Sequence, residues 1–177
     1  NNMLNTLTVV GLGYVGLPTA VLFASKGFRV FGVDVDIAKV HAINSGRCYI
    51  REPGLDVLLC DAVSKGFLKA TTNAVEAVSE SDAVVIAVPT PVRDGVADLS
   101  YLKQALLAVR EGLYRGLLVV IESTIPPGTT AGFAKPPLEE TDLKSRTSHF
   151  VHVPERIMPV TILKSLTYYE GRISCRC

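Results

Sequence analysis

The sequence carries almost no excess charge of either sign. Lysine and arginine together number 18 and aspartate and glutamate 17, which gives a formal net charge of +1 at pH 7. A groove for nucleic acid, or a surface that binds anionic lipid, needs clustered basic residues, and the sequence has no such cluster. We therefore expect no nucleic acid and no membrane among the partners of this chain.

Long apolar runs are missing as well. Although 48% of the residues are hydrophobic, no run approaches the roughly 20 residues that span a bilayer. The asparagine-rich start lacks the basic and then apolar pattern of a signal peptide, which favours a cytoplasmic location. The 177 residues suffice for one domain with a substantial core, with or without an appended piece.

Cysteine is scarce, and its spacing is uninformative. The four cysteines form no C-x-x-C pair and have no zinc-ligand spacing with the histidines, so we predict no metal site. Cys60 follows the apolar residues 57–59, which predicts a small buried side chain rather than a nucleophile. No role is predicted for the two cysteines near the end of the sequence, Cys175 and Cys177.

Strand and helix patterns alternate along most of the chain. Such alternation predicts parallel strands joined by right-handed crossovers. We expect a doubly wound, Rossmann-type α/β fold over residues 1–159, with about six mostly parallel strands and helices on both faces of the sheet. The predicted strands are residues 7–10, 29–34, 67–70, 83–88, 117–121 and 149–153. The predicted helices include 37–45, 55–64, a short one capped by Thr72 or Asn73, one capped by Asp98 or Ser100 and ending near 113, and a weak one from about 129 to 136.

Three glycines follow the first predicted strand in the pattern G-x-G-x-x-G. Gly11 permits a tight turn, Gly13 lets backbone amides approach a pyrophosphate, and Gly16 lets the next helix pack against the strand. The free amides and the dipole at the start of that helix favour a bound phosphate. The position of the glycines between a strand and a helix therefore predicts a dinucleotide cofactor.

An acidic residue closes the second predicted strand. Asp34 lies 34 − 16 = 18 positions after the third glycine, near the place of the acid that binds the adenosine ribose. A carboxylate accepts hydrogen bonds from a ribose diol and repels a 2′-phosphate, so we expect NAD rather than NADP. Lys39 has the reach to contact the same ribose or a phosphate, although a lysine on an exposed helix is more often a solvated charge.

Other predicted strands also end in polar or rigid residues. Thr90 stands between two prolines after residues 83–88, Thr124 follows residues 117–121, and Glu155 follows residues 149–153. Threonines cap helices and acidic residues lie in solvated loops for structural reasons alone. In a doubly wound sheet, however, ligands bind outside the carboxyl ends of the strands, where all of these residues are expected to meet.

Seven ordered motifs, spread over residues 6 to about 160, resemble the N-terminal domain of the UDP-glucose/GDP-mannose 6-dehydrogenase family. They are Gly11-Leu-Gly-Tyr-Val-Gly-Leu-Pro18, Gly32-Val-Asp34, Glu52-Pro-Gly54, Ala87-Val-Pro-Thr-Pro91, Asp98-Leu-Ser-Tyr101, Glu122-Ser-Thr-Ile-Pro-Pro-Gly-Thr-Thr130 and Pro154-Glu-Arg-Ile-Met-Pro159. The resemblance implies oxidation of a sugar alcohol to a carboxylate by two NAD-dependent hydride transfers, through a thiohemiacetal and a thioester on a cysteine. Within the family, three segments are most similar to enzymes that act on UDP-N-acetylmannosamine, and UDP-glucose is the alternative substrate.

The resemblance also implies roles for individual residues. The implied cofactor-binding residues are Gly11, Gly13, Tyr14, Val15, Gly16, Asp34, Lys39, Pro89, Thr90 and Thr124. Among them, Tyr14 and Val15 are implied to contact the pyrophosphate, and Thr90 and Thr124 the nicotinamide side. The resemblance further implies that Thr124 helps to hold a catalytic water. Outside this set, the resemblance implies that Glu155 assists thioester hydrolysis and that Arg156 and Ile157 contact the UDP-sugar.

The sequence departs from the family pattern at its end. Members of the family continue through a long central helix into a second α/β domain that supplies the cysteine nucleophile. Residues 160–177 instead form a tail that resembles the start of a truncated connector. We therefore expect a half that binds NAD, is inactive alone, and belongs to an enzyme that is dimeric when complete. Other NAD oxidoreductases, such as hydroxyacid dehydrogenases, and a non-catalytic nucleotide-binding module are the alternatives.

Overall fold

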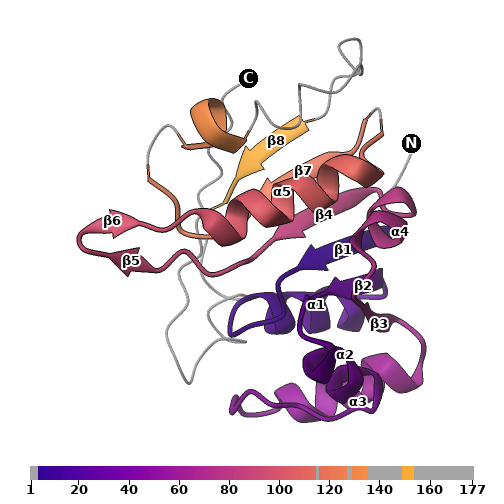
Figure 1. Cartoon of the computed structure of the whole chain (residues 1–177). Helices are drawn as coiled ribbons and strands as arrows, with labels where there is room; N and C mark the ends of the chain where they lie inside the picture. The colour runs from indigo at the N-terminus through magenta and orange to yellow at the C-terminus, as the bar shows by residue number, and fades with distance from the viewer. Residues whose placement is uncertain (1–3, 115, 127–128, 135–148, 154–177) are drawn as a thin grey trace.

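Six parallel strands form a single sheet in a computed structural model that describes residues 4–114, 116–126, 129–134 and 149–153. The order is β3-β2-β1-β4-β7-β8 (Figure 1). Counted along this sheet alone, the order is 3-2-1-4-5-6, that of a Rossmann fold. The predicted fold class is therefore confirmed. The strands are β1 Thr6–Val10, β2 Arg29–Val33, β3 Leu68–Thr71, β4 Ala83–Ile86, β7 Leu118–Ile121 and β8 His149–His152.

Helices cover both faces of the sheet, as predicted. Because side chains alternate along a strand, neighbours such as Val9 and Val10 enter different cores. Val9 packs in a core with three helices, α1 Gly16–Ser25, α2 Ile37–Asn44 and α3 Leu55–Ser64. Val10 packs in a core with α4 Ala74–Ser79, α5 Ser100–Gly112 and the π-helix η1 Thr130–Ala134. None of the helices in the described ranges is long and apolar enough to cross a membrane.

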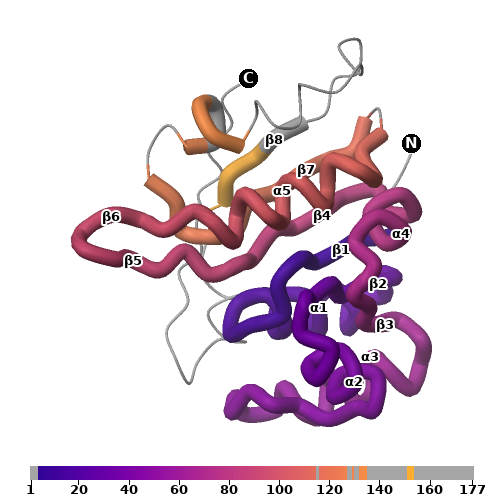
Figure 2. The backbone as a smooth tube through the Cα atoms, in the orientation of Figure 1, coloured from indigo at the N-terminus to yellow at the C-terminus, as the bar shows by residue number. Residues whose placement is uncertain are grey.

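A hairpin that the sequence patterns did not predict follows β4. Its strands are β5 Val92–Arg93 and β6 Val96–Ala97, and it projects beyond the sheet (Figure 2). The two residues between them, Asp94 and Gly95, both have positive φ, 51° and 77°. This geometry is that of the tight hairpin turn for which Asp-Gly is a strong sequence signal. The predicted strand 83–88 correspondingly ends at Ile86.

The structure decides between some local alternatives and corrects other local predictions. Asn73, not Thr72, caps α4 by accepting from the Glu76 amide at 3.2 Å. Asp98 accepts from the Ser100 amide at 3.0 Å, but the residue directly before α5 is Leu99. The helix expected from about 129 is confined to the five residues of η1 within the described range, and its predicted end near 136 lies outside that range.

The prediction that Cys60 is buried is wrong. Cys60 is exposed, whereas the preceding residue, Leu59, is completely buried in the core against α1. Successive residues of an α-helix point about 100° apart. The apolar run 57–59 therefore does not form one buried stretch. On α3 its residues lie on both the buried and the exposed face, and Val57 is 67% exposed.

Candidate functional site

The order of the strands reverses between β1 and β4, and the loops after these two strands touch. Gly11 follows β1 with φ +92°, and a Cβ added to it would lie 2.7 Å from the carbonyl oxygen of Ala87, which follows β4. Both the conformation and the close approach exclude other residues. In open α/β sheets, such a reversal creates a crevice outside the carboxyl ends of the strands, and ligands bind there.

The three glycines of the fingerprint are required for different reasons. A Cβ on Gly16 would lie only 1.6 Å from the carbonyl oxygen of Gly11, so the first turn of α1 packs directly on the loop. Gly13, in contrast, lacks a positive φ, and no heavy atom of the described structure lies within 4 Å of its added Cβ. Protein packing alone does not explain a glycine there. An approaching ligand does, which fits the pyrophosphate role predicted for Gly13.

Backbone donors face this opening. Within the described residues, the amides of Gly13, Tyr14 and Val15 donate to no protein acceptor. No side chain caps α1, and its first turn contains no acidic residue. Unpaired amides at the start of a helix attract anions. The loop and the helix therefore present the donors that a diphosphate requires.

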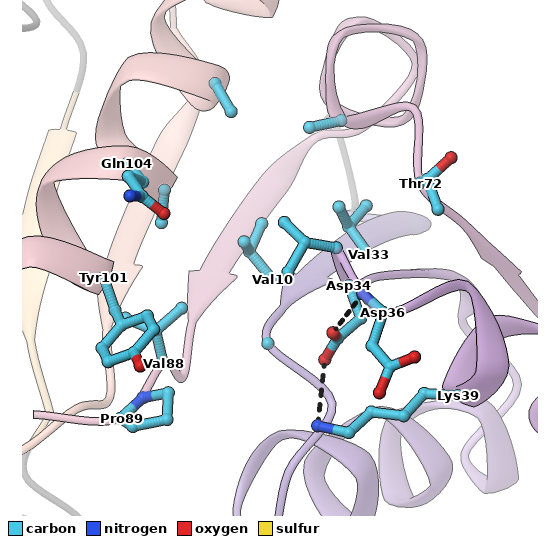
Figure 3. Close-up of a pocket in the computed structure, with 15 residues that line it drawn as sticks. Val10, Val33, Asp34, Asp36, Lys39, Thr72, Val88, Pro89, Tyr101 and Gln104 are labelled. Carbon is cyan, nitrogen blue, oxygen red and sulfur yellow. Dashed lines mark hydrogen bonds and ion pairs between the residues drawn. The ribbon is translucent and has the colours of Figure 1, made fainter.

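Asp34 lies directly after β2 at the edge of this opening. Its Oδ2 accepts from the Leu12 amide at 2.9 Å, and its Oδ1 accepts from the Asp36 amide at 3.0 Å. The Nζ of Lys39 lies 3.6 Å from Oδ2 (Figure 3). Because the two amides fix the carboxylate, its remaining lone pairs have a defined direction, and the prediction that strand β2 would lead into this acid is confirmed.

Two adjoining cavities meet at Gly11, Asp34 and Lys39. The first, of about 440 Å³, is lined by nine of the ten predicted cofactor-binding residues, all except Gly16, which lies beneath the loop. The second, of about 300 Å³, extends towards α5. In Figure 3, Tyr101 and Gln104 of α5 face Asp34 and Lys39 across this second cavity. Together the cavities form an elongated site for an extended ligand.

The far end of the first cavity is built from the loops after β4 and β7. The Thr90 hydroxyl donates to the carbonyl oxygen of Thr124 at 2.6 Å. The Ser123 hydroxyl donates to the carbonyl oxygen of Val88 at 2.8 Å. The ring Nε2 of His152 from β8 lies 3.2 Å from the Ser123 carbonyl oxygen. These contacts bring the predicted residues Thr90 and Thr124 together at one edge of the sheet.

Three residues at the site were not predicted. Glu122, which is 8% exposed, accepts from the Thr19 hydroxyl of α1 at 3.1 Å to each carboxylate oxygen. Tyr49 donates to the glycine loop, and Tyr101 lines the second cavity. Glu122 and Tyr101 belong to two of the seven sequence motifs, and these motifs are the signal that points to them. For Tyr49 there was none, because its partner lies 37 residues away.

Neither described cysteine lines these cavities. Cys48 is partly buried, donates to the Ile50 carbonyl oxygen at 3.3 Å, and has its pKa raised mainly by burial, so the reactive thiolate is disfavoured. Cys60 is exposed on α3. The predicted residues Glu155, Arg156 and Ile157, and the tail 160–177, lie outside the described residues.

Comparison with known proteins agrees with this geometry. Residues 5–173 match the NAD binding domain of the UDP-glucose/GDP-mannose dehydrogenase family. The chain belongs to this family. Its cofactor is accordingly NAD, as the fingerprint and Asp34 predicted. The resemblance seen in the sequence motifs is thereby confirmed.

Individual relatives act on different sugars. UDP-N-acetyl-D-mannosamine dehydrogenase of Pyrococcus horikoshii is 45% identical over 163 residues, which cover 92% of this chain and 39% of the relative. The structure of UDP-N-acetyl-mannosamine dehydrogenase from Staphylococcus aureus aligns with a TM-score of 0.89 at 37% identity, covering 97% of this chain and 41% of the other. The structure of a UDP-glucose dehydrogenase from Pyrobaculum islandicum aligns with a TM-score of 0.86 at 39% identity. The alignment covers 94% of this chain and 39% of the other. The chain thus spans about two fifths of these relatives.

Proposed function

We propose that this chain is the NAD-binding half of a nucleotide-sugar 6-dehydrogenase that oxidises UDP-N-acetylmannosamine to the corresponding uronic acid. The observation that carries the proposal is the cavity in which unpaired amides of the glycine loop and the fixed carboxylate of Asp34 lie side by side. The mannosamine relative at 45% identity supports the choice of sugar.

The donors and acceptors of the site divide between the parts of the cofactor. The amides of Gly13, Tyr14 and Val15 bind the diphosphate, and the carboxylate of Asp34 accepts hydrogen bonds from the adenosine ribose. The ammonium of Lys39, 3.6 Å from Asp34, lowers the repulsion between that carboxylate and the phosphates. The second cavity, with Tyr101 and Gln104 on its far side, takes the adenine.

The far end of the first cavity takes the nicotinamide, between Pro89, Thr90 and Thr124. Held there, NAD would supply the hydride acceptor for oxidation of the sugar alcohol. The Thr124 side chain is exposed at this end, where its hydroxyl can hold a water. We propose that Glu155 activates that water, because a carboxylate near an acyl carbon can accept a proton from water. We propose that Arg156 and Ile157 contact the UDP-sugar.

Binding without turnover tests this function. We propose that the 177-residue chain binds NAD but does not complete the reaction, since the described cysteines lie away from the site. Calorimetry should show NAD binding and much weaker NADP binding, because Asp34 repels a 2′-phosphate. No NADH should form from UDP-sugars. Full turnover by this chain would contradict the proposal.

UDP-glucose is the second candidate substrate, favoured by the Pyrobaculum islandicum enzyme at 39% identity. The two sugars are best separated with the protein encoded by the complete gene, assayed for NADH formation on UDP-N-acetylmannosamine and UDP-glucose in parallel. We expect a higher kcat/KM for the former. A preference for UDP-glucose would transfer the proposal to that substrate and leave the cofactor site unaffected.

A further inference from the structure

The peptide groups on both sides of Leu12 are fixed by side chains from distant parts of the chain. The Leu12 amide donates to Asp34 Oδ2 at 2.9 Å, and the Leu12 carbonyl oxygen accepts from the Tyr49 hydroxyl at 2.5 Å. The side chain of Leu12 is fully buried and packs so closely over Gly32 that a Cβ there would lie 3.0 Å from it. The middle of the glycine loop therefore has little freedom.

The Tyr49 hydroxyl comes from a well-anchored segment. Tyr49 lies between α2 and α3, and the next residue, Ile50, is 6% exposed and shares a core cluster with Leu12. Burial raises the pKa of the Tyr49 hydroxyl well above its ordinary value, and the charge of Asp34 is the next largest cause. The phenol thus keeps its proton at neutral pH and remains a hydrogen-bond donor.

The hydrogen bond to Leu12 determines the direction of the next amide. The carbonyl of Leu12 and the N–H of Gly13 belong to one planar trans peptide, so they point in opposite directions. When Tyr49 holds the carbonyl on its own side of the loop, the Gly13 N–H is turned away from Tyr49. Gly13 lines the first cavity, and its amide has no acceptor among the described residues.

We propose that Tyr49 is a positioning residue for the cofactor diphosphate, because its hydroxyl holds the Leu12 carbonyl and thereby aims the Gly13 amide at the phosphates. This proposal rests on the proposed placement of NAD along the glycine loop. It adds a residue from outside the fingerprint to the machinery that binds the diphosphate. Tyr49 itself lines neither cavity, so it acts through the backbone rather than by touching the cofactor.

The change Tyr49→Phe removes the hydroxyl and keeps the ring. Tyr114→Phe is a matched control, because the Tyr114 hydroxyl donates to the carbonyl oxygen of Ser81 at 2.6 Å and Tyr114 lines neither cavity. Calorimetry with NAD and ADP, and NMR titration with adenosine, would be carried out on both variants and on the unchanged 177-residue chain. The three ligands separate diphosphate binding from nucleoside binding.

We expect Tyr49→Phe to lower the affinities for NAD and ADP by about tenfold, which is the effect of one misdirected hydrogen bond to a charged group. Adenosine affinity should not change in this variant, and Tyr114→Phe should leave all three affinities unchanged. Unchanged NAD affinity in Tyr49→Phe, or an equal loss for adenosine, would overturn the proposal. Absence of NAD binding to the unchanged chain would instead refute the proposed cofactor placement.

A measurement on the unchanged chain keeps the proposal testable should Tyr49→Phe fold poorly. In an amide NMR spectrum, the Gly13 signal should shift strongly on addition of ADP and very little on addition of adenosine. The proposal fails if ADP binds and the Gly13 signal does not respond. If the variant folds, the chemical shift of the Gly13 amide without ligand should also differ from that in the unchanged chain. The reason is that the Leu12 carbonyl no longer accepts the hydrogen bond from Tyr49.

Discussion

The two ends of the sheet differ in whether the polar groups in their loops have hydrogen-bond partners within the described structure. At the amino ends of the strands, Asp82 accepts from the amides of Asn5 and Thr6, both at 2.9 Å, and Tyr114 donates to Ser81 at 2.6 Å. At the carboxyl ends, the amides of Gly13, Tyr14 and Val15 have no acceptor within the described structure. The first arrangement stabilises the fold, and the second leaves donors for a ligand.

The largest expected effect tests how tightly the carboxyl end is packed. Gly16→Ala places a Cβ 1.6 Å from the Gly11 carbonyl oxygen, so α1 must shift. Urea denaturation should show a loss of about 3 kcal/mol or more in the free energy of unfolding, and NAD binding should disappear. Gly27→Ala is the control, because nothing lies within 4 Å of its Cβ and only its positive φ should matter, at about 1–2 kcal/mol. Equal effects of the two changes would show that the loop is looser than the geometry indicates.

Gly13→Ala should separate binding from stability most clearly. Its Cβ meets no described atom within 4 Å, so the free energy of unfolding should change by less than about 1 kcal/mol. The methyl group would occupy the space of the diphosphate, and NAD affinity should fall by at least about tenfold. Both quantities can be followed on one preparation by denaturation and calorimetry. Retained affinity would mean that the phosphates lie elsewhere.

The same substitution, aspartate to asparagine, can be compared at the two ends of the sheet, at Asp34 and at Asp82. Asp34→Asn removes the charge that accepts from the ribose, so NAD affinity should fall by about tenfold. It should also weaken discrimination against NADP, since less charge faces a 2′-phosphate. Asp82→Asn should leave both affinities unchanged, because Asp82 lies at the amino end. Calorimetry with NAD and NADP on both variants checks this, and a loss of NAD affinity in Asp82→Asn would contradict the comparison.

The smallest effect concerns the pH dependence of stability. Two backbone amides hold the pKa of Asp82 below its ordinary value of 3.8. A lowered folded-state pKa stabilises the protein above the unfolded value and ceases to do so as the pH falls through the folded value. Asp82→Asn should therefore lower the free energy of unfolding near neutral pH, by about 0.5 kcal/mol at this poorly buried site, and the difference should vanish in acid. A difference that persists well below pH 3.8 would exclude this cause.

The fold and most of the site were predictable because their signals are local. Residues 7–34 contain the glycine pattern, the strand before it and Asp34. Thr90 and Thr124 follow two parallel strands, and the carboxyl ends of neighbouring parallel strands lie at the same edge of a sheet. The β5–β6 hairpin also has a local signal, Asp94-Gly95, but the prolines just before it favour a rigid loop and obscure that signal. To predict that Cys60 is exposed, one must know which side of α3 faces the core, and an apolar run alone does not reveal this.

The bond from Tyr49 to Leu12 illustrates what sequence patterns cannot give. It joins positions 37 residues apart, and it depends on how the segment between α2 and α3 is anchored at Ile50. No spacing rule connects a tyrosine with a carbonyl group. The pairing of Thr19 on α1 with Glu122 after β7, 103 residues apart, has the same origin. Both contacts follow from tertiary packing and not from a local motif.

A crystal structure of this chain with NAD is the most direct test of whether the carboxyl end of the sheet is the cofactor site. We expect phosphate oxygens within hydrogen-bonding distance of the Gly13 amide, and adenosine ribose hydroxyls on the carboxylate of Asp34. NAD bound away from the glycine loop, or with its ribose out of reach of Asp34, would contradict the central claim that these unpaired donors exist to hold a dinucleotide.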